Sequence, residues 1–154
     1  MLGTGGALKK AQNLLDDYFF VINGDTYLPV DYSEVERAFV RRGKKALTVV
    51  YNNQEDTSVR NNVELDSDLM VIRHDKESPD SSLKYVEAGV IALRREALNL
   101  TKEERHPISL EKALYRALIQ QRELAAYVTK QRFYDIGTSE QQRILEEFLK
   151  KRAK

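Results

Sequence analysis

The stretch "YFFVINGDTYLPVD", residues 18–31, decides the fold class of this 154-residue chain. An unbroken apolar run from Tyr18 to Ile22 leads through Asn23 directly into Gly24 and Asp25. A short apolar run that ends in turn residues is typical of a β-strand buried on both faces, as strands are in α/β sheets. The sequence therefore predicts a buried strand that delivers a carboxylate at its C-terminal end.

Two explanations fit the Asn-Gly-Asp tripeptide at the end of this run. Ligands of open α/β sheets bind outside the carboxyl ends of the strands, and Gly24 would let backbone approach a ligand closely. Asn-Gly and Gly-Asp are also strong turn formers, and a plain turn is the commoner explanation of the tripeptide alone. Further motifs are needed to choose between a ligand site and a turn.

The rest of the chain alternates between strand and helix patterns. Alternation of this kind predicts an α/β layered sheet, here within one domain covering residues 1–154. Helices are expected over 7–15, between the capping residues 31–33 and Gly43, and over 95–98, 108–121 and 139–151; strands are expected over 18–23, 45–51, 62–65, 69–73, 84–93 and 124–128.

Composition excludes several classes of protein. The 25 basic and 24 acidic residues nearly cancel, which argues against bulk electrostatic binding to nucleic acid or to an anionic membrane. Without cysteine there are no disulfides and no thiolate metal sites. No apolar run approaches the roughly 20 residues of a membrane helix, and the N-terminus lacks a secretory signal pattern. A cytoplasmic protein is the default expectation.

A second motif, "FYDIGTSE" at residues 133–140, again places an aspartate at the end of an apolar segment. Asp135 precedes Gly137, hydroxyl residues and a predicted helix, so the motif also fits ordinary helix-start chemistry. Two strand-end carboxylates, Asp25 and Asp135, are nevertheless what a Mg²⁺ ion bound to phosphates requires, since Mg²⁺ takes few protein oxygens and leaves its other positions to water and phosphate.

A third motif, "LGTGGALKKAQNLL", opens the chain with glycines around Thr4 and runs into a helix. Backbone N–H groups and the helix dipole at such a start suit a phosphate or a polar heterocycle. The motif is neither a Walker loop nor a dinucleotide fingerprint. A flexible terminus is the alternative explanation.

In this order and spacing, the motifs resemble those of the sugar-1-phosphate nucleotidylyltransferase family. The matching segments are "LGTGGAL" (2–8), "FFVINGDTY" (19–27), "YVEAGVIALRREAL" (85–98) and "FYDIGTSE" (133–140). The segment "RHDKESPDSSLKYVEAG" (73–89) looks most like the branch of the family that activates mannose-1-phosphate-type or heptose-1-phosphate-type sugars. The resemblance extends from Leu2 to about Phe148.

The resemblance implies a mixed, Rossmann-like sheet of the glycosyltransferase-A type and a Mg²⁺-dependent reaction. An oxygen of the sugar 1-phosphate attacks the α-phosphate of a nucleoside triphosphate, which gives a nucleotide sugar and pyrophosphate. By motif position, Asp25 and Asp135 would hold the metal. The other implied contacts are those of Gly3 and Thr4 with the nucleobase, Gly24 with the nucleoside, Lys76 with the sugar phosphate, and Glu87 and Gly89 with the sugar.

The chain departs from the family pattern at two places. Glu87 stands where many relatives have asparagine, which leaves the identity of the sugar open, and Lys76 also fits a solvated loop lysine. The family's first strand and its glycine-rich GGxGTRL loop have no counterpart in this sequence. The chain therefore resembles the C-terminal two-thirds of the family domain, truncated at the N-terminus, and we expect it to be inactive alone.

Two alternatives to this enzyme stay open at the level of sequence. One is a noncatalytic module that binds nucleotides or sugar phosphates, and the other is a related metal-dependent glycosyltransferase. In the family's sheet, the strand over 18–23 lies beside the missing first strand. Here it would form an exposed apolar edge, and such edges pair with other chains. We therefore expect a homodimer, because closed twofold contacts are the commonest solution for identical chains.

Overall fold

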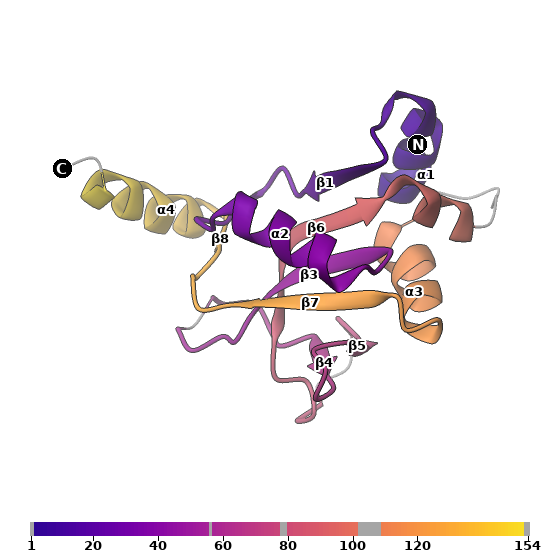
Figure 1. Cartoon of the computed structure of the whole chain (residues 1–154). Helices are drawn as coiled ribbons and strands as arrows, with labels where there is room; N and C mark the ends of the chain where they lie inside the picture. Colours follow the sequence, from indigo (N-terminus) through magenta and orange to yellow (C-terminus); the bar gives the residue numbers. More distant parts are fainter. Residues whose placement is uncertain (1, 56, 78–79, 102–108, 153–154) are drawn as a thin grey trace.

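A four-stranded mixed sheet forms the centre of the protein. The computed structural model describes residues 2–55, 57–77, 80–101 and 109–152. The central strand β6 runs antiparallel to both of its neighbours, and β7 runs parallel to β3. Helices cover both faces, which confirms the predicted α/β class with a mixed sheet (Figure 1). In spatial order the strands are β1 (Tyr18–Ile22), β6 (Val86–Arg94), β3 (Ala46–Tyr51) and β7 (Leu124–Thr129).

The strand β1 lies at an edge of this sheet. In the described part of the chain it pairs only with β6, in a register that runs from Tyr18 opposite Arg94 to Ile22 opposite Val90. The prediction that β1 is buried on both faces is wrong at its ends, because Tyr18 is 37% and Ile22 50% exposed. Its middle residues are partly buried: Phe19 and Val21 pack on one face of the sheet, and Phe20 packs on the other.

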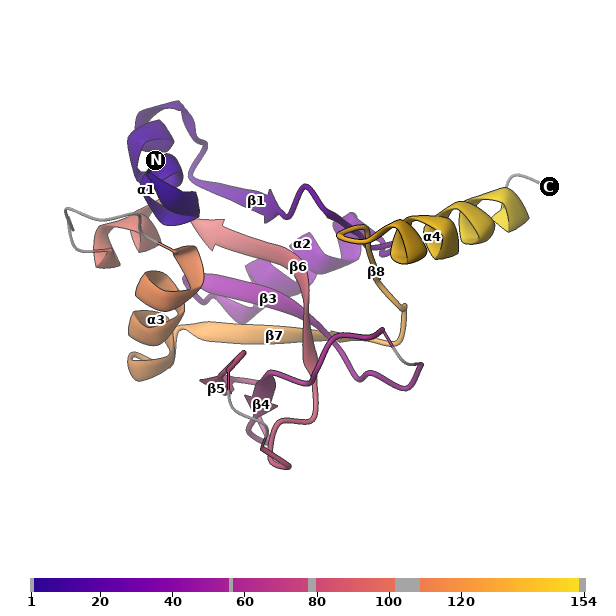
Figure 2. The ribbon, with the colours of Figure 1, turned by 180° about the vertical axis from the view of Figure 1, so that it is seen from behind.

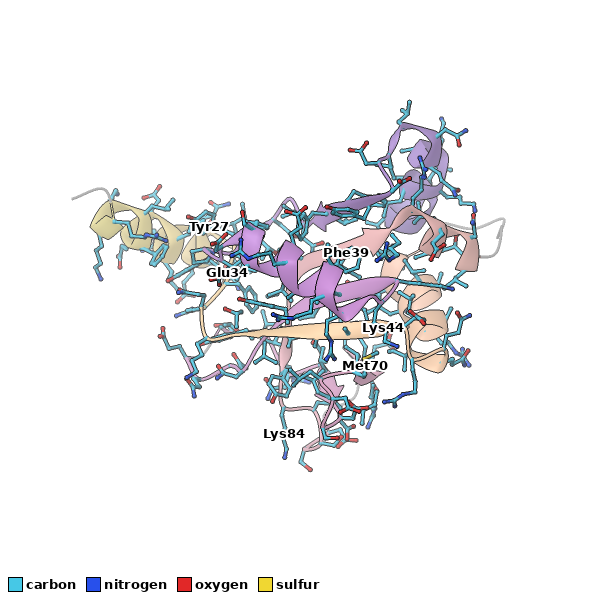
Figure 3. All side chains as sticks on the ribbon, in the orientation of Figure 1. Tyr27, Glu34, Phe39, Lys44, Met70 and Lys84 are labelled. Atoms are coloured by element: carbon cyan, nitrogen blue, oxygen red, sulfur yellow. The ribbon has the colours of Figure 1, made fainter. Side chains whose placement is uncertain are left out.

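One face of the sheet is covered by α2 (Tyr32–Arg42). The Asp31 side chain accepts a hydrogen bond from the Ser33 N–H at 2.8 Å and caps the helix, as the sequence predicts. Gly43 ends it with a left-handed φ of 62°, a conformation that glycine adopts without strain. Phe39 points from α2 over the sheet (Figure 3) and is buried in the core on this face.

Short helices cover the other face: α1 (Gly3–Ala11), η1 (Gln12–Leu14), η2 (Arg95–Leu100), η3 (Glu111–Tyr115) and α3 (Arg116–Gln120). Leu114 and Leu118 are fully buried here against Leu93 of β6. The helix predicted over 108–121 is confirmed except that residue 108 lies outside the described residues and that η3 is π-helical rather than α-helical.

Two small pairs of strands complete the fold: β2 (Thr26–Tyr27) with β8 (Tyr134–Asp135), and β4 (Val63–Leu65) with β5 (Val71–His74). The sequence predicts no β2 and no β8, because two residues are too few to show a period. The last helix, α4 (Ser139–Arg152), leads away from the body of the molecule and buries none of its residues (Figure 2). None of the helices in the described residues is long and apolar enough to cross a membrane.

Candidate functional site

A cavity of about 530 Å³ opens at the C-terminal end of β1, beside the first half of β6 and the β2–β8 pair. Five residues that the sequence singles out lie in its wall: Asp25, Lys76, Glu87, Gly89 and Asp135. The remaining lining residues are Asn23, Thr26, Ser58, Val59, Arg60, Asn62 and Phe133. The fold thus brings together side chains that are up to 112 positions apart in the sequence.

The β2–β8 pair holds the two aspartates at the same cavity. Thr26 pairs with Asp135 across the strands, and the Ile136 N–H donates to the Asp25 carbonyl oxygen at 2.9 Å. Asp25 Oδ1 accepts from the Thr26 hydroxyl at 3.3 Å, and Asp135 Oδ1 accepts from the Gly137 N–H at 2.6 Å. In the described part of the chain, no donor is hydrogen-bonded to Oδ2 of either aspartate.

The orientation of the Asp135 carboxylate requires a glycine at position 137. A Cβ atom added to Gly137 would lie 2.9 Å from Asp135 Oδ1, a distance that real Cβ atoms essentially never show. A side chain at position 137 would therefore push the carboxylate away from the backbone N–H that now holds it. The glycine of the "DIG" motif acts on the orientation of the aspartate two residues before it.

Glu87 and Lys76 form a charged pair at the cavity. The Glu87 side chain is only 6% exposed, and its Oε2 lies 3.6 Å from Lys76 Nζ. Burial raises the pKa of Glu87, and the charge of Lys76 opposes that rise. Burial also acts on the pKa of Lys76, in the lowering direction, but the hydrogen bond to Glu111 and the charge of Glu87 outweigh it and raise that pKa. Asn62 Oδ1 accepts from the Glu87 N–H at 2.9 Å and fixes the backbone there.

Gly89 gives the cavity its shape where β1 and β6 separate. Its φ is 74°, and a Cβ added to it would meet three side-chain atoms of Thr26 at 3.0 Å. Its carbonyl oxygen accepts from the Asn23 N–H at 2.9 Å, one residue beyond the end of β1. Only glycine adopts this φ routinely and leaves room for Thr26.

None of the three residues that the resemblance assigns to the nucleotide lines this cavity. Gly3 and Thr4 belong to α1, which lies at the opposite end of β1 from β8 (Figures 1 and 2). Thr4 Oγ1 accepts from the Leu110 N–H at 3.0 Å and so ties α1 to the segment before η3. Gly24 does not line the cavity, although both of its neighbours, Asn23 and Asp25, do.

Negative charge predominates in the cavity wall. Asp25, Glu87 and Asp135 supply three carboxylates, and Arg60 and Lys76 supply two cations. No group of three or more His, Cys, Asp or Glu residues lies close enough to hold a metal ion within the described ranges. Two aspartates without a third ligand suit Mg²⁺, which usually keeps several waters and is bound by one or two carboxylates together with substrate phosphates.

The sequence matches the model of a known protein family. Residues 1–151 match the family model described as nucleotidyl transferase. The chain belongs to the nucleotidyl transferase family. This match confirms the family to which the four sequence motifs point.

Several mannose-1-phosphate guanyltransferases are similar to this nucleotidyl transferase family member. The proteins from Candida albicans and Saccharomyces cerevisiae are each 27% identical over 150 residues. Each alignment covers 88% of this chain and 38% of the relative. The chain thus spans less than half the length of the curated relatives that it matches.

Solved structures show the same fold. HddC from Yersinia pseudotuberculosis complexed with GMP-PN superposes with a TM-score of 0.73 at 25% identity, over 96% of this chain and 63% of that one. An inositol-1-phosphate CTP transferase from T. maritima superposes with a TM-score of 0.75 at 16% identity, over 94% of this chain and 60% of that one. The predicted nucleotidyltransferase type of mixed sheet is therefore confirmed.

Sequence reasoning missed part of the cavity wall of this nucleotidyl transferase family member. Ser58, Arg60 and Asn62 line the cavity from the polar segment between β3 and β4. That segment shows no apolar period and none of the four motifs, so nothing in its pattern indicates a site. Phe133 was missed as well, although it opens the "FYDIGTSE" motif, because an aromatic residue in an apolar segment suggests only packing.

We expect Gly89→Ala to lower the free energy of unfolding by about 1–3 kcal/mol, since a left-handed φ alone costs a side chain about 1–2 kcal/mol and the contact with Thr26 adds to it. Urea unfolding followed by circular dichroism measures the change. Gly24→Ala is the matched control, because no atom lies within 4 Å of the position of its Cβ. Equal stability of the two variants would contradict the steric role of Gly89.

Proposed function

We propose that this chain supplies the metal-binding and sugar-phosphate-binding part of a nucleotidyl transfer site. The reaction joins a nucleoside monophosphate unit from a nucleoside triphosphate to a sugar 1-phosphate and releases pyrophosphate. The observation that carries the proposal is the convergence of Asp25, Asp135, Lys76, Glu87 and Gly89 on one cavity. The guanyltransferase relatives support the same chemistry.

In this proposal Asp25 and Asp135 hold Mg²⁺, each through the oxygen that no described donor occupies. A Mg²⁺ ion bound there supplies positive charge that neutralises the phosphates and orients them for in-line attack. The carboxylate-rich wall would otherwise repel a phosphate. Asp135 is held in place for this task by the Gly137 N–H.

Lys76 and Glu87 serve the sugar phosphate. The Lys76 ammonium offers a charge-assisted hydrogen bond to the phosphate, and the buried Glu87 carboxylate accepts hydrogen bonds from sugar hydroxyls. Gly89 leaves open the space that a side chain would fill. Gly24 remains the proposed contact with the nucleoside. We leave Gly3 and Thr4 out of the proposed site, since α1 lies at the far end of β1 and the Thr4 hydroxyl already binds Leu110.

A second candidate function is noncatalytic binding of a nucleotide sugar or a sugar phosphate. Among the described lining residues only Arg60 and Lys76 are cationic, which is little charge to stabilise a reacting triphosphate. Removing even one preorganised donor from an active site typically costs on the order of 10²–10³ in rate. The match to the nucleotidyl transferase model favours both candidates over a related glycosyltransferase.

We expect residues 1–154 to bind GDP-mannose or mannose 1-phosphate in the presence of Mg²⁺ and to release no detectable pyrophosphate from GTP. Isothermal titration calorimetry with and without EDTA measures binding, and a coupled pyrophosphate assay measures turnover. Binding that is equally tight in EDTA would refute the metal site. Rapid pyrophosphate release would refute noncatalytic binding and would establish transfer by this chain.

Two further parts of the proposal concern the oligomeric state of the chain and its cellular compartment. We propose that it acts as a homodimer through the open edge of β1, and the test is given in the Discussion. The cytoplasm, expected from the sequence, stays a prediction.

A further inference from the structure

Lys76 stands between two cavities. It lines the proposed active site, and it also lines a second cavity of about 620 Å³. The wall of this second cavity includes His74, Glu111 and Tyr115. The position of the Lys76 ammonium therefore decides which of the two spaces receives its charge.

Two carboxylates compete for that ammonium. Glu111 Oε1 lies 2.6 Å from Lys76 Nζ, within hydrogen-bond distance, whereas Glu87 Oε2 lies at 3.6 Å. Glu87 is the more buried of the two, since its side chain is 6% exposed and that of Glu111 is 32% exposed. A buried carboxylate attracts a cation more strongly at equal distance, because the local dielectric constant is lower. The contact with Glu111 thus opposes a closer approach of Lys76 to Glu87.

The element that carries Glu111 is anchored in the core by Tyr115. Glu111 begins η3 and Tyr115 ends it, and Tyr115 is fully buried with its ring 5.0 Å from that of His74. Burial raises the pKa of Tyr115 well above its usual value, and the charge of nearby Glu87 adds to the rise. π-helical turns such as η3 are rare and occur frequently at functional sites.

A second ion pair joins the same two segments with the charges exchanged. Glu77 Oε1 lies 3.1 Å from Lys112 Nζ, one residue along from the Lys76–Glu111 pair on each side. Both of these side chains are 80% exposed, so the pair adds little stability. It is the natural control, because it connects the same segments without reaching the active-site cavity.

We propose that Glu111 is a positioning residue for the proposed sugar-phosphate site. By binding the Lys76 ammonium, it prevents a close ion pair between Lys76 and Glu87. Lys76 can then bind the phosphate, and Glu87 can bind the sugar. This inference rests on the proposed function. Without Glu111, Glu87 is the nearest carboxylate to the ammonium among the residues that the structure describes. The lysine then closes onto Glu87, and each group neutralises the other instead of binding substrate.

Other charged groups face Lys76 from the surrounding elements. In the active-site cavity these are Arg60, Asp25 and Asp135. The second cavity adds the cations Arg73, Lys112 and Arg116, the carboxylates Asp75 and Glu77, and His74. Of the carboxylates in the described residues, Glu87 and Glu111 are the two that pair with Lys76 Nζ within 4.0 Å. Removing Glu111 therefore leaves Glu87 as the dominant partner.

The test compares Glu111→Gln with Glu77→Gln in the full chain. One readout is the pKa of the Lys76 ammonium, followed by NMR of chain labelled with ¹³C-lysine and assigned with Lys76→Arg. The other is the affinity for mannose 1-phosphate in Mg²⁺, measured by calorimetry. We expect Glu111→Gln to lower the pKa of Lys76, because the mutation removes the hydrogen bond and charge that raise this pKa and because the move toward Glu87 takes the ammonium further out of water. We also expect it to weaken binding by about tenfold, a change that calorimetry resolves readily. Glu77→Gln should change neither, and Glu111→Asp, which keeps the charge, should recover part of both.

The outcomes separate this inference from the proposed function. If the wild-type chain does not bind mannose 1-phosphate but Glu111→Gln still lowers the pKa of Lys76, the proposed function fails and the positioning of Lys76 by Glu111 stands. An unchanged Lys76 pKa in Glu111→Gln overturns the inference. Equal loss of affinity in Glu77→Gln and Glu111→Gln also overturns it, since the role would then be structural. If Glu111→Gln does not fold, Glu111→Asp takes its place as the test variant. The inference then holds only if Glu111→Asp shifts the pKa of Lys76.

Discussion

Replacing Asp25 or Asp135 with asparagine is expected to weaken Mg²⁺-dependent binding of GDP-mannose by about a hundredfold, equivalent to about 2.7 kcal/mol. Asparagine preserves the volume of the side chain and one carbonyl oxygen but removes the negative charge that Mg²⁺ prefers. Both aspartates line one cavity, so the loss of either leaves a single carboxylate for the ion. Calorimetry at fixed Mg²⁺ concentration measures the affinity.

Asp31→Asn is the matched control for this pair of variants. Asp31 lies outside the cavity and caps α2 through the Ser33 N–H, a role that asparagine fills equally well. Its affinity for GDP-mannose should equal that of the wild-type chain. If Asp25→Asn and Asp135→Asn both bind as tightly as Asp31→Asn, neither aspartate is a metal ligand and the proposed site is wrong.

The chain is expected to self-associate through the open edge of β1, and Ile22→Lys is expected to weaken that association by at least about tenfold. The strand pairs on one side only within the described sheet, and no charge or proline lies between Tyr18 and Ile22 to block a second partner. A lysine at such an edge is a device by which natural proteins prevent pairing. Analytical ultracentrifugation over a micromolar concentration range measures the dissociation constant.

Ile22 is suited to this test because half of its surface is exposed. Phe20 is less suitable, since its ring packs 5.8 Å from that of Tyr32 and contacts the core, so a charge there would also destabilise the fold. Val40→Lys on α2 is the control, at a side chain that is 53% exposed. A wild-type chain that sediments as a monomer throughout the range, or equal effects of Ile22→Lys and Val40→Lys, would contradict an interface at β1.

The sequence by itself determined the longer strands and both ends of α2, although α1 (Gly3–Ala11) begins before the helix expected over 7–15. The apolar runs of β3 and β6 are long enough to indicate strands, and Asp31 and Gly43 mark both ends of α2 because caps depend on local backbone chemistry. The motifs around Asp25 and Asp135 likewise identified two carboxylates at strand ends. Each of these features depends on residues within about ten positions of one another, which is why a pattern in the chain is sufficient to predict them.

Only the tertiary structure decided which of the predicted residues meet. The pairing of β2 with β8 places Asp25 and Asp135 at one cavity, and strands of two residues carry no periodic signal. The same packing sets Gly3 and Thr4 at the other end of β1, exposes Ile22 at the edge, and brings Glu111 to within 2.6 Å of Lys76. The space for a Cβ at Gly89 is limited by Thr26, a residue 63 positions away in the chain. Contacts between distant segments depend on the register of the strands and on how the helices pack over the sheet. Neither of these produces a recognisable pattern in the local sequence.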